Sequence, residues 1–216
     1  MKKTAGIFVI LILTVSVASA QLVQFGVKGG VNFSKLKFDD IKNVTSNGKE
    51  YNLMESNAFT GFHVGVMTRV NLFSLFIQPE LYFNTAGGKV VVQELQSSGT
   101  DYKTYTRNVK FSKIDLPVMT GLKVGPVRVN AGPVASIILS TQSGLNEIIP
   151  ELSTMAKSAT IGYQVGFGVD LFKFVTLDYR FEGSLSKWGD KITVGGQDYA
   201  FDSRGNMSMI SLGILF

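Results

Sequence analysis

The sequence predicts an all-β fold, namely an eight-stranded antiparallel up-and-down β-barrel that spans a membrane. Three observations lead to this prediction. Apolar and polar residues alternate in eight stretches of the chain, with the period of two that is typical of a strand with one apolar and one polar face. The connections between these stretches are alternately short and long. No Asp, Glu, Lys or Arg occurs on the apolar side of any stretch.

The first twenty residues have the pattern of a cleaved signal peptide. Lys2 and Lys3 precede an apolar run of twelve residues, and a small-residue cleavage site ends at Ala20. This run is too short for a spanning helix. We therefore expect residues 1–20 to direct export through the inner membrane and to be removed, and residues 21–216 to form one outer-membrane β-barrel domain.

Composition narrows the possible partners without fixing the fold. The chain contains no cysteine, so disulfides do not hold it together. Its net charge of +5 falls to +3 without the two leader lysines, which is too little and too scattered for a nucleic-acid partner. The hydrophobic fraction of 45% would suit a soluble periplasmic protein equally well.

The strands are predicted in order by the same alternation. In the first, Phe25, Val27 and Val31 oppose Lys28 and Asn32. The eight expected strands span residues 24–34, 61–72, 75–84, 114–123, 127–137, 161–171, 175–185 and 210–216. This pattern gives three tight turns, expected at the periplasmic end, and four long extracellular loops, as in small outer-membrane barrels.

The long connections cover roughly residues 35–57, 86–104, 141–158 and 187–203. The first of them has mixed charge and no evident apolar core, so we expect it to be solvated and mobile.

A soluble barrel or sandwich, with the apolar face buried, is the competing interpretation. The glycines on the polar face argue against it, because glycine weakens a solvent-facing strand but makes room for large side chains inside a narrow barrel. These glycines are Gly26, Gly30, Gly61, Gly65, Gly121, Gly132, Gly162, Gly166 and Gly168. A charge-free outer face also avoids the roughly 2–4 kcal/mol that Arg or Lys costs at the bilayer midplane.

Several fragments together resemble a known family. They are GVKGGVNFS at 26–34, FIQPELYF at 76–83, KIDLPVMTGLKVG at 113–125, VNAGPVAS at 129–136, and GYQVGFGVDLF with LDYRFEGSLS within 162–186. In order and spacing they resemble the Bacteroidetes-type outer-membrane β-barrel family, the PorT-like group often labelled "porin family". The resemblance implies an outer-membrane location and an eight-stranded barrel. Some members are accessory parts of a secretion apparatus.

Charged residues on the polar face are predicted to fill the barrel interior. The predicted network contains Lys28, Arg69, Glu80, Asp115, Arg128, Asp170, Asp178, Arg180 and Glu182, with Lys123 on the same face. A selective pore usually presents rings of one sign, whereas unpaired buried charges are costly. Balanced charges therefore favour an internal plug, and a narrow or gated ion path is the alternative. Arg69, Arg128 and Asp170 are expected near the periplasmic end.

No catalytic, cofactor or metal site is predicted. His63 is the sole histidine, so neither a histidine-rich nor a cysteine-containing metal site can form. It is expected to point inward, away from the lipid that a barrel hydrolase would have to reach. The glycines of residues 162–168 lack the strand-then-helix context of a nucleotide loop.

Aromatic residues are expected to form girdles at both membrane interfaces. Around the outer strand ends lie Tyr51, Phe59, Tyr82, Phe83, Tyr102 and Tyr105, and at the inner ends lie Phe73, Phe172, Phe174 and Phe216. Two girdles would account for many of these residues.

The third long loop contains apolar residues at helical spacing, which predicts a short amphipathic helix. Its apolar residues are Leu145, Ile148, Ile149, Leu152 and Met155. The helix would either pack on the barrel rim or contact a partner.

The leading functional hypothesis is a non-enzymatic outer-membrane protein with a structural or interaction role, for example as an accessory subunit of an envelope or secretion assembly. Its expected partners are outer-membrane lipid and envelope proteins, with no nucleic acid, metal or cofactor. A narrow porin for ions or small solutes is the alternative, and a lipid-modifying barrel enzyme is a third hypothesis.

Overall fold

A computed structural model describes residues 22–37, 41–46, 49–95, 102–144, 153–156, 159–172, 174–187, 189–194 and 197–216. The predicted signal peptide lies outside these residues. The strands are β1 Val23–Lys37, β2 Ile41–Ser46, β3 Lys49–Leu72, β4 Leu75–Leu95, β5 Tyr102–Val124, β6 Val127–Ser143, β7 Ser153–Ala156, β8 Ala159–Leu171, β9 Val175–Ser184, β10 Gly189–Val194 and β11 Gln197–Leu215.

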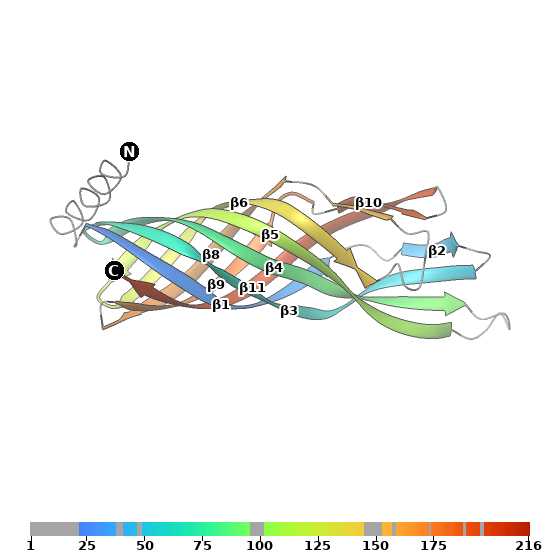
Figure 1. The fold of residues 1–216 in the computed structure, drawn as a ribbon, viewed down its shortest axis with the longest axis horizontal. Helices are drawn as coiled ribbons and strands as arrows, with labels where there is room; N and C mark the ends of the chain where they lie inside the picture. Colours follow the sequence, from blue (N-terminus) through green and yellow to red (C-terminus); the bar gives the residue numbers. More distant parts are fainter. Residues whose placement is uncertain are drawn as a thin grey trace, which may run out of the picture.

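Eight of these strands close into a ring, as predicted. Each pairs antiparallel with its neighbour in the order β1-β3-β4-β5-β6-β8-β9-β11, and β1 pairs with β11 to complete the circle. Figure 1 shows the long strands side by side, with the carboxyl terminus at the end that carries the tight turns. Closure leaves the ring without a free edge, which a spanning sheet requires because lipid cannot satisfy backbone groups.

The three tight turns lie where the sequence predicts them. They connect β3 to β4, β5 to β6 and β8 to β9. The backbone has a positive φ at Phe73, Gly125 and Phe172. Glycine adopts this conformation at little steric cost, whereas a bulky side chain rarely does so.

The outer and inner faces of the barrel differ in polarity. The outer face exposes apolar side chains such as Val64 and Leu212, while the inner face buries polar ones such as Asn32 and Gln78. The alternation of burial along β1 follows the predicted period of two. Within the described ranges, no helix has the length and apolarity needed to cross a membrane.

The long connections differ from the prediction, because much of their length is β-structure. β3, β4, β5 and β11 continue well past the predicted strand ends, β2 pairs with β3, and β10 pairs with both β11 and β7. We call these continuations, together with β2, β7 and β10, the outer extension. Figure 1 shows β2 and β10 at the end opposite the tight turns.

The outer extension encloses an apolar core, so the expectation of a solvated first loop without a core is wrong. The buried cluster consists of Leu36, Val44, Tyr51, Leu53, Tyr82, Ala86, Val90, Val92, Val109, Phe111, Met207 and Met209. Tyr51 and Tyr82, two of the aromatic residues at the outer strand ends, are buried and face inward, so they are not among the girdle residues. Tyr82 shares the parity of Glu80, and therefore its inward direction.

The predicted helix in the third loop is contradicted at Met155. This residue lies in β7, where it pairs with Lys191 of β10, because the ladder to β10 satisfies its backbone in the extended form. The other four residues of the predicted contact loop, Leu145, Ile148, Ile149 and Leu152, lie outside the described residues.

We predict that Leu53→Ala loosens the outer extension while the membrane barrel stays folded. Leu53 is 1% exposed, and a buried Leu→Ala change costs about 2–5 kcal/mol. Limited proteolysis and amide hydrogen exchange of β2 and β3 would measure the loosening.

Met54→Ala is the matched control, because the adjacent Met54 lies on the opposite face and is only partly buried. Equal protection of β2 and β3 in the two variants would contradict a stabilising core at this end.

Candidate functional site

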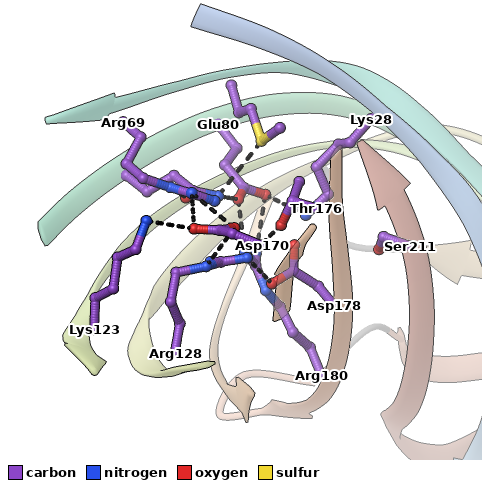
Figure 2. Close-up of polar contacts among 12 residues, drawn as sticks. Lys28, Arg69, Glu80, Lys123, Arg128, Asp170, Thr176, Asp178, Arg180 and Ser211 are labelled. Atoms are coloured by element: carbon purple, nitrogen blue, oxygen red, sulfur yellow. Dashed lines mark hydrogen bonds and ion pairs between the residues drawn. The ribbon is translucent and has the colours of Figure 1, made fainter. Parts of the chain in front are cut away.

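The predicted interior charges lie inside the barrel. Eight of the nine are buried residues, and the side chain of the ninth, Asp170, is 6% exposed. Figure 2 shows side chains from several strands converging across the lumen. The interior charges form three clusters at successive heights along the barrel, and Figure 2 labels residues of the middle and lower ones.

The middle cluster joins three strands through one carboxylate. Glu80 on β4 accepts a hydrogen bond from Lys28 Nζ on β1 at 2.9 Å. It also accepts two from Arg180 on β9, from Nη1 to Oε2 at 2.9 Å and from Nη2 to Oε1 at 2.8 Å. This bidentate geometry is the strong form of an arginine–carboxylate pair. Because β9 is not adjacent to β4 in the ring, these bonds cross the lumen.

The lower cluster, nearer the tight turns, places three cations on Asp170. Its carboxylate accepts from Lys123 Nζ at 2.7 Å, Arg128 Nε at 2.9 Å and Arg69 Nη1 at 3.1 Å. Arg128 also donates to Asp178 Oδ1 at 3.1 Å. Arg69, Arg128 and Asp170, which are expected near the periplasmic end, therefore meet in one cluster, and Asp178 contacts this cluster through Arg128.

The upper cluster contains a cation that the predicted network lacks. Lys113 Nζ lies 2.6 Å from Glu182 Oε1 and 3.1 Å from Asp115 Oδ1. Lys113 is 1% exposed. It has the same parity as Asp115, so extending the fourth predicted strand by one residue toward its start would have found it.

The glycines of the inner face make room for these side chains, as predicted. A Cβ atom on Gly166 would lie 2.7 Å from Arg180 Cγ, and one on Gly121 would lie 2.9 Å from the Phe76 ring. Both distances are far below van der Waals contact, so a larger residue would displace the network.

His63 lies inward, as predicted, and contacts a serine. Its Nε2 is 2.7 Å from Ser211 Oγ, and both residues are buried. Within the described part of the chain, His63 Nδ1 has no hydrogen-bond partner, so no acidic residue orients the ring as in a hydrolytic triad. The contact faces the lumen, whereas the lipid-enzyme hypothesis requires a crevice open to lipid.

At the outer end, Glu94 forms a separate ion pair. Lys49 Nζ lies 2.5 Å from Glu94 Oε1, and the Tyr105 hydroxyl donates to Oε2 at 3.3 Å. The hydrogen bond from Lys49 holds the pKa of the Glu94 carboxyl below its ordinary value. This pair ties the start of β3 to the end of β4.

A closed ring of eight antiparallel strands, apolar outside and polar inside, defines an integral outer-membrane β-barrel. Residues 19–188 match the sequence profile of the family described as "Outer membrane protein beta-barrel domain". The chain belongs to this family, whose members reside in the outer membrane. No curated protein matches the chain in sequence.

Several solved structures are similar to the chain. The attachment invasion locus protein Ail of Yersinia pestis is 11% identical, with 91% of this chain and 100% of that chain covered and a TM-score of 0.47. Neisserial surface protein A is 12% identical, with coverages of 89% and 97% and a TM-score of 0.47. OprG of Pseudomonas aeruginosa is 11% identical, with coverages of 90% and 96% and a TM-score of 0.46.

We predict that Glu80→Gln lowers the free energy of unfolding by about 3–5 kcal/mol, because it leaves two buried cations without their counter-charge. Urea titration of the protein folded in lipid vesicles would measure the change. Arg180→Met in the same chain should recover part of the loss, because it removes one of the two unpaired charges.

Glu50→Gln, at an exposed residue of β3, is the control and should leave the unfolding midpoint unchanged. A Glu80→Gln protein as stable as the wild type would show that the middle cluster does not hold the barrel together.

Proposed function

We propose that this protein is a non-enzymatic outer-membrane barrel that acts by contact with other envelope proteins rather than by transport. In this proposal it is a PorT-like member of its family and an accessory subunit of an envelope or secretion assembly. The order and spacing of the fragments between residues 26 and 186 support the PorT-like assignment.

The observation that carries the proposal is the Lys28–Glu80–Arg180 bridge across the lumen. All three residues are at most 3% exposed, and their bonds join non-adjacent strands. The interior of an eight-stranded barrel is only wide enough for side chains, so this bridge occupies the space through which a solute would pass. Charges of both signs at this height also differ from the single-sign rings of a selective pore.

The outer extension supports the second half of the proposal. A buried apolar cluster holds its strands in place, and a well-packed surface binds a partner at less entropic cost than a mobile loop. The surfaces available for contact are therefore this extension and the rim at the tight turns.

We predict that the purified wild-type protein gives no resolved current steps in a planar lipid bilayer. Combining Glu80→Ala with Arg180→Ala should produce them, because it removes the bridge from both sides of the lumen. The control combines Lys37→Ala with Glu50→Ala, both exposed residues at the outer end, and should be silent. Wild-type steps that change in a Glu80→Gln or Arg180→Met variant would instead establish the narrow porin.

A second prediction concerns assembly. Tagged mature protein solubilised gently from its native membrane should come away with other envelope proteins in fixed stoichiometry. Recovery of the barrel alone would count against the accessory-subunit role.

A further inference from the structure

The periplasmic mouth of the barrel contains an open vestibule of about 830 Å³. This volume lies within the range of about 300–1,000 Å³ typical of small-ligand sites. Lys123 and Asp170 line it, together with Phe73, Phe172, Phe174 and Phe216. Lys123 and Asp170 thus form a charged floor, and the four phenylalanine side chains form an aromatic rim around it.

The floor has an excess of positive charge. Lys123, Arg69 and Arg128 all bind the single carboxylate of Asp170. Within the described part of the chain, only Arg128 of these three has a second acidic partner, Asp178. Behind the floor, Arg69 Nη2 and Arg128 Nη1 are buried and have no hydrogen-bond partner among the described residues. The Lys123 side chain remains 32% exposed. The floor therefore offers an accessible ammonium group, backed by two guanidinium groups, to an anion.

Two of the four aromatic residues of the rim, which are the phenylalanines expected at the inner strand ends, are exposed at a steric cost. Phe73 and Phe172 have φ values of 58° and 53°, a region that bulky residues rarely adopt. Phe73 is 105% exposed and Phe172 82% exposed, so burial within the barrel does not compensate for the conformation. The remaining tight turn, between β5 and β6, has Gly125 at the corresponding position. A residue without steric strain therefore fits such a turn.

From these features we infer that the vestibule binds an acidic, aromatic-containing peptide segment of a periplasmic protein. The carboxylates of the segment pair with the exposed ammonium group of Lys123, and its apolar side chains pack on the Phe73 and Phe172 rings. The strand ring separates this mouth from the surrounding lipid, so a ligand reaches it from the periplasmic water. This inference deepens the proposed function, because it names the chemistry of a contact partner and its place on the barrel.

The test uses the full mature protein in lipid nanodiscs and a dye-labelled eight-residue peptide of alternating phenylalanine and glutamate. Fluorescence anisotropy measures its Kd, with empty nanodiscs as the background. A peptide with lysine in place of glutamate should bind at least tenfold more weakly. Lys123→Gln should weaken binding of the glutamate peptide at least tenfold, whereas Lys37→Gln, the same change at the outer end, should leave it unchanged.

Phe73→Gly is the second variant, and it separates binding from folding. Glycine relieves the positive φ, so the barrel should resist urea at least as well as the wild type while its peptide affinity falls at least fivefold. Equal binding of the two peptides, or wild-type affinity in both Lys123→Gln and Phe73→Gly, would overturn the inference. Inorganic phosphate that binds as tightly as the glutamate peptide would also overturn it, because the site would then recognise a simple anion. Peptide binding and bilayer current are measured independently. Failure of this inference can therefore be distinguished from failure of the proposed function.

Discussion

The rest of the structure depends on one constraint, which is that charges excluded from the lipid-facing wall must pair within a very narrow lumen. Lipid leaves no place for them outside, and an eight-stranded ring leaves little room inside. The lumen meets both demands with three stacked ion-pair clusters and with glycines on neighbouring strands, such as Gly166 beside Arg180. The contacts that pair the buried charges are therefore the same contacts that fill the lumen.

The alternation of apolar and polar residues in the sequence predicts whether a side chain faces the lumen or the lipid. It does not predict which other side chain it contacts. Each of the nine predicted interior charges faces inward, because the period of two continues through every ring strand. Which charges meet depends on strand register and on closure of the ring. Lys28 and Arg180 reach Glu80 from strands that are not its neighbours, and alternation within a single strand contains no information about such a contact.

The outer extension is not predicted from the sequence, because the polarity of the two faces is reversed beyond the membrane boundary. There the apolar side chains face inward and polar ones face outward. On β1, Phe33 faces outward within the apolar band, whereas two positions further Lys35 faces outward and Leu36 faces inward. The same change occurs on β4, where Val90 and Val92 are buried in the extension. A search for apolar residues on the outward parity therefore ends at this boundary, although the strand continues.

This inversion has a consequence for how the protein is inserted. Strand β1 carries Lys35 and Lys37 beyond its apolar band, so both cations must cross the hydrocarbon before the barrel reaches its final depth. Each lysine at the midplane costs about 2–4 kcal/mol. Once across, the two lysines hinder reverse movement, because sliding the barrel back toward the periplasm would draw them through the hydrocarbon again. The reversal in pattern therefore opposes movement of the inserted barrel back toward the periplasm.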